Sequence, residues 1–269
     1  MDKLDYIRIL KPYNWIKNML IALPIYFNGY LFESSLYPIT ALSIIATSLA
    51  SSAGYIINDI LDIEEDKHHP YKRNRPFASG RVPIIAGYII SILLAIVSIY
   101  LDQTRLVIAL LLFDMIYNFK ARDIPILDIV VLSSKYPIRA YIGYIIINKY
   151  PNIFLLLSTF LVAVILAIFK RKGEIGIYNR SVMKYYNKYN LDLLMSISTI
   201  SLIVTLIALF YRYKLILLAS ALVILYMIFY YISLDYSKSK SLAILKDKYF
   251  LVLLLCLGIS SYFELYGGV

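Results

Sequence analysis

Long apolar stretches alternate with short charged segments along the chain. Each stretch is close to the ~20 residues that a helix needs to cross a hydrocarbon core, and the mean hydropathy is +0.72. The pattern predicts an all-α integral membrane protein with a single membrane domain over residues 1–269. The nine expected transmembrane helices cover 18–34, 36–57, 82–101, 104–119, 126–147, 152–169, 191–210, 214–233 and 249–266.

The lysines and arginines set an expected orientation in the membrane. Most of the 27 lie in the N-terminal segment or in alternate connections, whereas Arg105, Lys149, Arg212 and Lys214 lie on the other side. Basic residues concentrate in cytoplasmic loops. The N-terminus is therefore predicted in the cytoplasm and the C-terminus outside the cell membrane, and no signal peptide is expected.

The net charge of +10 is distributed over alternate loops of the expected bundle. A nucleic-acid-binding protein gathers its cations on one face, so nucleic acid is not an expected partner. Membrane lipids with anionic headgroups and phosphorylated substrates fit this distribution better. The single cysteine, Cys256, excludes an intramolecular disulfide.

The first charged connection, about 58–81, begins with a regular array of carboxylates. On a helix, Asp59, Asp62 and Asp66 fall at about 0°, 300° and 340° around the axis, hence on one face. At an effective dielectric near 20, each close pair of charges costs about 2 to 3 kcal/mol. A divalent cation removes this cost, and Mg²⁺ prefers oxygen ligands. The array predicts a Mg²⁺ site, with the Asn58 amide beside it.

A basic segment follows the carboxylates at once. Lys72, Arg73 and Arg75 can donate charge-assisted hydrogen bonds to phosphate oxygens. The segment would then bind a phosphorylated substrate next to the metal. The alternative stays open that these residues are basic only because the loop lies in the cytoplasm.

Charges also occur inside the expected helix at 126–147. Asp128, Lys135 and Arg139 share one stripe of a helical wheel, and charges within a membrane usually face a cavity or a partner. The two cations repel each other at i, i+4, and a bound phosphate would satisfy both. The alternative is a structural salt bridge from Asp128 to one of them.

Four stretches resemble a known family. Asn58 to Asp66 is similar to the first aspartate motif of the UbiA superfamily of membrane prenyltransferases. The resemblance implies a nine-helix bundle whose central cavity opens to the cytoplasmic side and holds Mg²⁺ and a diphosphate. Residues 69–80, 11–18 and 127–140 look like the branch of decaprenyl-phosphate phosphoribosyltransferases.

The second charged connection, about 170–190, departs from the superfamily. Prenyltransferases usually carry a second aspartate motif there, but this chain has a basic segment with Glu174 as its one nearby carboxylate. The segment looks similar to the phosphoribosyltransferase branch. A segment with more basic residues and fewer carboxylates suits a substrate that carries more phosphate groups. The alternative is a basic cytoplasmic loop with a Lys170–Glu174 surface pair.

The favoured hypothesis is a Mg²⁺-dependent transfer of 5-phosphoribose from phosphoribosyl diphosphate to a polyprenyl phosphate, with release of diphosphate. The first alternative is prenyl transfer from a prenyl diphosphate to an aromatic or lipid acceptor, and a transporter is less favoured. The expected catalytic residues are Asp59, Asp62, Asp66, Lys135 and Arg139. The expected substrate-binding residues are Lys17, Asn18, Asn58, Lys72, Arg75, Lys120, Lys170, Arg171, Glu174, Arg180 and Tyr185.

Overall fold

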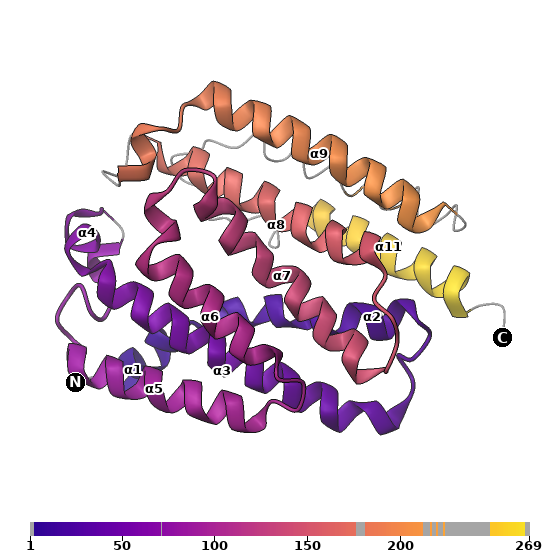
Figure 1. The fold of residues 1–269 in the computed structure, drawn as a ribbon, viewed down its shortest axis with the longest axis horizontal. Helices are drawn as coiled ribbons and strands as arrows, with labels where there is room; N and C mark the ends of the chain where they lie inside the picture. Colours follow the sequence, from indigo (N-terminus) through magenta and orange to yellow (C-terminus); the bar gives the residue numbers. More distant parts are fainter. Residues whose placement is uncertain are drawn as a thin grey trace. The chain divides into compact units, whose positions relative to one another are not determined.

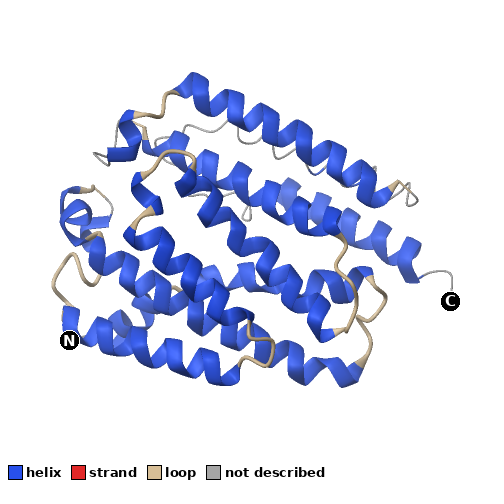
Figure 2. Cartoon of the chain, viewed as in Figure 1, coloured by secondary structure: helices blue, strands red, loops and turns tan. Residues whose placement is uncertain are grey.

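The computed structural model describes residues 3–70, 72–175, 181–211 and 248–266, together with residues 216, 219 and 223. All regular secondary structure in these residues is helical (Figure 2). The chain divides into two compact units, one formed by Met1–Tyr150 with Tyr178–Val182 and the other by Pro151–Ile177 with Met183–Val269. Each unit is described by itself, and the expectation of a single membrane domain stays a prediction.

The first unit contains most of the helices (Figure 1). Its α-helices are α1 (Lys3–Leu10), α2 (Ala22–Phe27), α3 (Tyr37–Leu61), α4 (Ile63–His68), α5 (Ile84–Leu101), α6 (Leu106–Phe119) and α7 (Leu127–Ile146). Its 3₁₀ segments are η1 (Pro12–Ile21), η2 (Ser34–Leu36), η3 (Lys72–Asn74) and η4 (Ala121–Asp123).

Helix α3 is the central element of the first unit. It packs against α1, η1, α5, α6 and α7, and Figure 1 shows α5 and α6 beside it. Its buried side chains are mostly small, and they include Ser43, Ala46, Ser48, Ala50, Ser51, Ser52, Ala53 and Gly54. Small residues let the backbones of neighbouring helices approach closely in a membrane, so α3 can contact several elements at once.

The second unit contains α8 (Ile153–Glu174), α9 (Lys188–Phe210) and α11 (Lys248–Tyr266). Helices α8 and α9 pack against each other. Each begins at an asparagine whose side chain accepts a hydrogen bond from a backbone N–H of the first turn, Asn152 in α8 and Asn187 in α9. Asparagine is a favoured residue at this position because it satisfies a free donor of the helix end.

Within the described residues, four helical segments are long and apolar enough to cross a membrane, by length and composition. They are Ser34–Leu61, Ile84–Leu101, Ile153–Glu174 and Lys188–Phe210. Helix α5 is the most apolar of them, and isoleucines such as Ile85, Ile92 and Ile96 are exposed along it. An exposed apolar surface of this kind suits contact with lipid.

Seven of the expected transmembrane helices coincide with α3, α5, α6, α7, α8, α9 and α11, with boundaries that differ by a few residues. The expected helix at 18–34 is wrong in extent, because η1 ends at Ile21 and α2 ends at Phe27. Gly29 follows α2 with a φ of 82°, and Tyr30 N donates to Ile25 O at 2.9 Å, so a left-handed glycine ends the helix. The helix expected at 214–233 lies outside the continuously described residues, so the count of nine stays a prediction.

Gly143 permits a close approach between α7 and the backbone where η1 meets α2. A Cβ atom added at Gly143 would lie 2.1 Å from the backbone oxygen of Ile21 and 3.0 Å from Cδ of Pro24. The neighbouring atom is backbone, which cannot rotate away as a side chain can. Any side chain at this position therefore forces α7 away from η1.

We expect Gly143→Ala to lower the free energy of unfolding by about 1 to 3 kcal/mol, as overpacking of a close contact does. The matched control is Gly258→Ala in α11, where an added Cβ meets no atom within 4 Å. Alanine favours a helix over glycine by about 1 kcal/mol, so the control should melt at or above the wild-type temperature. Thermal unfolding in detergent measures both, and an unchanged Gly143→Ala melting temperature would contradict the close approach.

Candidate active site

The three aspartates of the predicted array lie at the junction of α3 and α4. Helix α3 ends at Leu61, Asp62 follows, and α4 begins at Ile63. The helical hydrogen bonds continue through the junction, from Asp62 N to Asn58 O at 3.0 Å and from Asp66 N to Asp62 O at 2.8 Å. All three side chains are buried, as expected for carboxylates on one face directed into the protein.

Each carboxylate is paired with a basic side chain. Asp59 Oδ1 accepts from Lys11 Nζ at 2.7 Å and from Arg75 Nη1 at 2.7 Å. Arg75 Nη1 also donates to Asp66 Oδ2 at 2.7 Å, and Arg122 Nη1 donates to Asp62 Oδ1 at 2.7 Å. We call these six residues the aspartate cluster. They bring together η1, α3, α4, η4 and the loop after α4.

A small hydrophobic core holds Arg75 and Lys11 in position. Phe77 and Val82 follow Arg75 in the loop, and they are buried against Ile9 of α1 and Ile56 and Ile60 of α3. These isoleucines flank Asp59 on the same helix, so burial of Phe77 carries Arg75 to the carboxylate.

Lys11 reaches Asp59 from a left-handed backbone conformation, with φ of 51°. This conformation is uncommon in residues other than glycine, and such residues persist only where the surrounding structure enforces them.

Burial changes the proton affinities of the cluster. It raises the pKa of Asp66, although Arg75 and Lys72 oppose the rise. Burial likewise lowers the pKa of Lys11 against the opposing effect of Asp59. For Arg75, burial lowers the pKa, but Asp59 and Asp66 together outweigh burial and raise it. The cations and carboxylates therefore depend on one another for their charges.

The aspartate cluster contains the type of ligand found in a magnesium site, the carboxylate oxygen. Its carboxylates are not gathered as a set of metal ligands. Within the described residues, no three His, Cys, Asp or Glu side chains come together as metal ligands. Carboxylate oxygens are the ligands that Mg²⁺ prefers, and Asp66 Oδ1 is buried without a hydrogen-bond partner. The residues therefore fit Mg²⁺ by ligand type. Binding of the ion would require the basic side chains to break their ion pairs with the carboxylates.

From the aspartate cluster toward the N-terminal end of α3, further polar groups follow the helix into the apolar part of the first unit. Asn58 Nδ2 donates to Asn118 Oδ1 at 3.1 Å, and Asn118 Nδ2 donates to the backbone oxygen of Gly54 at 3.3 Å. Asn18 Nδ2 donates to Ser48 Oγ at 2.8 Å. The predicted residues Asn58 of α3 and Asn18 of η1 therefore belong to one polar path along α3.

Lys135 and Arg139 lie on this path, and their partners differ from the expected ones. Lys135 Nζ donates to Asp114 Oδ1 of α6 at 2.5 Å, a partner from the neighbouring helix, and the alternative of a structural salt bridge from Asp128 stays a prediction. Arg139 is 3% exposed. Its guanidinium donates to Asn18 Oδ1 at 2.6 Å, to the Lys135 backbone oxygen at 2.7 Å and to Ser51 Oγ at 3.0 Å. All three acceptors are neutral.

The other residues predicted in the first unit lie nearer its surface. Lys17 is half-buried in η1, and Lys72 is half-buried at the start of η3. Lys120 is exposed at the end of α6, and Arg122 pairs with Asp62 two residues later. Sequence reasoning missed Lys11, Arg122 and Asp114. A carboxylate inside the apolar 104–119 stretch was the available signal for Asp114.

The second charged connection lies mostly in the second unit, whereas Tyr178–Val182 belongs to the first. Glu174 is buried and pairs with Arg171, so the alternative of a Lys170–Glu174 surface pair is wrong. Lys172 pairs with Asp192 of α9. Tyr185 is 67% exposed, and Arg180 lies outside the described residues. The roles predicted for this segment stay predictions.

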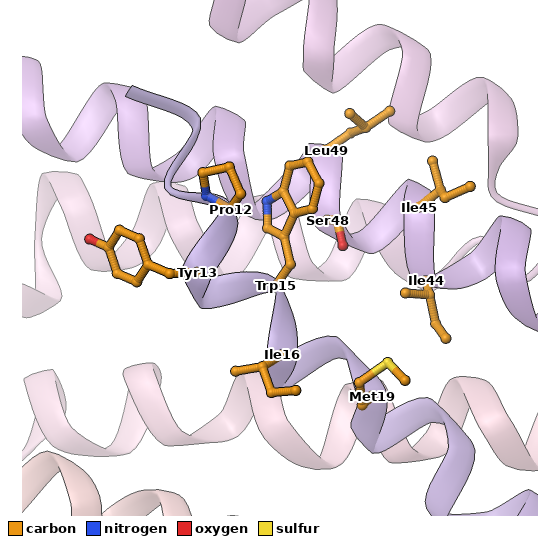
Figure 3. Close-up of a pocket in the computed structure, with 9 residues that line it drawn as sticks. All are labelled: Pro12, Tyr13, Trp15, Ile16, Met19, Ile44, Ile45, Ser48 and Leu49. Atoms are coloured by element: carbon orange, nitrogen blue, oxygen red, sulfur yellow. The ribbon is translucent and has the colours of Figure 1, made fainter. Parts of the chain in front are cut away.

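A pocket of about 460 Å³ lies between η1 and α3 (Figure 3). Its lining is mostly apolar and consists of Pro12, Tyr13, Trp15, Ile16, Met19, Ile44, Ile45, Ser48 and Leu49. Trp15 Nε1 donates to Ser52 Oγ at 3.0 Å, which fixes the indole against α3. The aspartates are not among its lining residues, so the expected central cavity stays a prediction.

The model of the UbiA prenyltransferase family matches residues 19–255. The chain belongs to this family. It is an integral membrane protein of a transferase family, as the apolar helices also indicate.

Two curated relatives differ in the activity that their names state. The decaprenyl-phosphate phosphoribosyltransferase of Mycobacterium tuberculosis is 31% identical over 148 residues, which are 51% of this chain and 49% of the relative. The digeranylgeranylglyceryl phosphate synthase of Sulfurisphaera tokodaii is 35% identical over 126 residues, 44% of this chain and 43% of the relative. The chain thus spans about half the length of the curated relatives that it matches.

The fold is similar to that of a UbiA homologue from Archaeoglobus fulgidus bound to DMAPP and Mg²⁺. The TM-score is 0.72, and the match covers 96% of this chain and 95% of the other at 16% identity. At this identity the likeness shows the fold, and the predicted family is confirmed by the family model.

We expect Arg75→Ala to lower the free energy of unfolding by roughly 2 to 4 kcal/mol in the absence of Mg²⁺, because it leaves buried carboxylates without their shared cation. Arg73→Ala is the matched control, since Arg73 is exposed in the same loop and surface substitutions usually stay within about 0.5 kcal/mol. Thermal unfolding in detergent compares the two variants. Equal melting temperatures would show that Arg75 does not stabilise the cluster.

Proposed function

We propose that this protein transfers 5-phosphoribose from phosphoribosyl diphosphate to a polyprenyl phosphate and releases diphosphate. An oxygen of the lipid phosphate forms a bond to C1 of the ribose, and the bond from C1 to the diphosphate breaks. The lipid phosphate is already ionised at neutral pH, so the reaction needs no dedicated general base. The 31% identity to a phosphoribosyltransferase supports the substrate class.

The observation that carries the proposal is the buried charge of Arg139. Arg139 donates to Ser51, which precedes Asp59 by about 12 Å along the axis of α3. A prenyl chain extending below a diphosphate at the aspartates would meet this uncompensated cation, and burial of such a charge is costly. A second phosphate would neutralise it. Phosphoribosyl diphosphate carries that phosphate on C5, whereas a prenyl diphosphate does not.

The aspartate cluster supports binding of a diphosphate with Mg²⁺. Asp59, Asp62 and Asp66 would hold the ion, which would supply Lewis-acid stabilisation of the leaving diphosphate. Lys11, Arg75 and Arg122 would then turn from the carboxylates to the phosphate oxygens, where charge-assisted hydrogen bonds are strong. Each charge would exchange one partner for another, and Lys72 would add a further cation beside Asp66.

The remaining predicted residues are proposed to bind phosphate as well. Lys17 and Lys120 would do so in the first unit, and the basic segment is proposed in its own right to bind phosphate through Lys170, Arg171, Glu174, Arg180 and Tyr185. The site would lie at the cytoplasmic mouth of a nine-helix bundle, with the N-terminus in the cytoplasm and the C-terminus outside. The charge distribution over the loops supports this orientation.

Prenyl transfer from a prenyl diphosphate is the second candidate. The identity to a digeranylgeranylglyceryl phosphate synthase favours it, and so does the apolar pocket between η1 and α3, which suits a hydrocarbon chain. The aspartate cluster serves either donor, because both carry a diphosphate. Buried Arg139 separates the two candidates.

The purified protein with Mg²⁺ should consume phosphoribosyl diphosphate only when a polyprenyl phosphate is present, because the lipid supplies the nucleophile. The measurement is the appearance of ribosylated lipid by mass spectrometry. A parallel reaction offers prenyl diphosphates with aromatic and lipid acceptors. Prenylated product there, with no ribosylated lipid in the first reaction, would replace the proposal with the second candidate.

The substitutions Asp59→Asn, Asp62→Asn and Asp66→Asn should each lower turnover by several orders of magnitude, and chelation by EDTA should abolish it. Loss of one carboxylate removes a ligand and part of the charge stabilisation of the leaving group. Turnover is measured with the lipid assay, and Glu64→Gln is a control at an exposed carboxylate of α4 that pairs with Lys67. Full activity in EDTA would remove the metal from the proposal.

A further inference from the structure

Asp114 is a half-satisfied carboxylate in the middle of the first unit. It is 8% exposed, and its Oδ1 is paired with Lys135. No described residue donates a hydrogen bond to its Oδ2. This oxygen is not among the buried side-chain atoms that lack a hydrogen-bond partner, so it stays open to a hydrogen-bond donor that the described chain does not supply.

Gly54 creates the space that Asp114 occupies. A Cβ atom added at Gly54 would lie 2.7 Å from both Cγ and Oδ2 of Asp114. The carboxylate therefore lies directly over the backbone of α3. Gly54 precedes Asp59 by about 7.5 Å along the helix axis, which places Asp114 between the aspartate cluster and the contact of Arg139 with Ser51.

Lys135 adds donors beside this acceptor. Its ammonium group has three N–H donors, of which one serves Asp114, and it lies over the ring of Tyr117 at 5.8 Å from the centroid. Arg139 follows one turn later with neutral acceptors only. An apolar chain would leave these groups unsatisfied, whereas a group with both hydroxyls and phosphate would satisfy the acceptor and the donors.

We infer that Asp114 accepts hydrogen bonds from the ribose hydroxyls of the donor and so selects a sugar diphosphate over diphosphate alone. The inference rests on the proposed function and names the residue that would recognise the sugar. Along α3 the polar groups follow the order of the donor, with the aspartate cluster for the diphosphate, Asp114 for the ribose and Arg139 for the 5-phosphate. Carboxylates bind ribose hydroxyls in other proteins.

The test compares the binding of two probes, phosphoribosyl diphosphate and inorganic diphosphate, each titrated with Mg²⁺ into the detergent-purified protein by calorimetry. Asp114→Asn should weaken binding of phosphoribosyl diphosphate by about tenfold or more, the effect of losing a hydrogen bond to a charged group. Inorganic diphosphate should bind as before or more tightly, because Lys135 is then freed from its counter-ion. The preference for phosphoribosyl diphosphate over inorganic diphosphate should thus shrink.

Gly54→Ala is the second variant, because its Cβ displaces the Asp114 carboxylate without changing any charge. It should reduce the preference for phosphoribosyl diphosphate in the same direction, and the control Glu64→Gln, at an exposed carboxylate of α4, should leave the preference unchanged. If Asp114 only balances the charge of Lys135, the affinities for both probes change by the same factor in Asp114→Asn, and the inference is overturned.

Wild-type binding separates this inference from the proposed function. A wild-type protein that binds phosphoribosyl diphosphate no more tightly than inorganic diphosphate would contradict both. A wild-type preference that persists in Asp114→Asn and Gly54→Ala would contradict the role of Asp114 alone.

Discussion

The pairing of buried charge is the constraint on which the first unit depends. An ion removed from water costs several kcal/mol unless a partner of opposite charge and further hydrogen bonds compensate it. Asp59, Asp62 and Asp66 are buried on α3 and at its end, so cations must reach them from elsewhere in the chain. Lys11, Arg75 and Arg122 come from three different segments. The positions of η1, of the loop after α4 and of η4 therefore follow from the need to neutralise one helix end.

Close pairing across helices in turn requires small residues. The buried face of α3 is rich in serine, alanine and glycine, which brings neighbouring backbones near and supplies hydroxyl groups to Trp15, Asn18 and Arg139. Gly143 brings α7 against the end of η1 in the same way. Arg139 lies one turn before Gly143, and so reaches Asn18. The polar path thus depends on residues that contribute little apolar surface of their own.

The sequence predicts the elements better than it predicts their partners. Apolar runs locate most helices because their period and length are local properties, and Gly29 was the overlooked local signal for the end of α2. The carboxylate array was equally readable. Its cations were not, because Lys11 and Asp59 are 48 residues apart and Arg122 and Asp62 are 60 apart. A helical wheel drawn for α7 alone offered Asp128 as a partner for one of the two cations, whereas Asp114, which Lys135 contacts, comes from the neighbouring helix. Tertiary packing decides such choices.

The same pairing bears on how a charged substrate would enter an apolar bundle. The aspartate cluster contains three carboxylates and three cations, so its desolvation is compensated before any ligand arrives. On the proposed function, the metal would take the carboxylates and the phosphate oxygens would take the cations, so the number of paired charges would not fall. Binding would then exchange partners in a preorganised polar site and would not require burial of new unpaired ions. Arg139 is the exception, because only neutral groups hold it. That excess charge is the feature that a ligand with one more phosphate would neutralise.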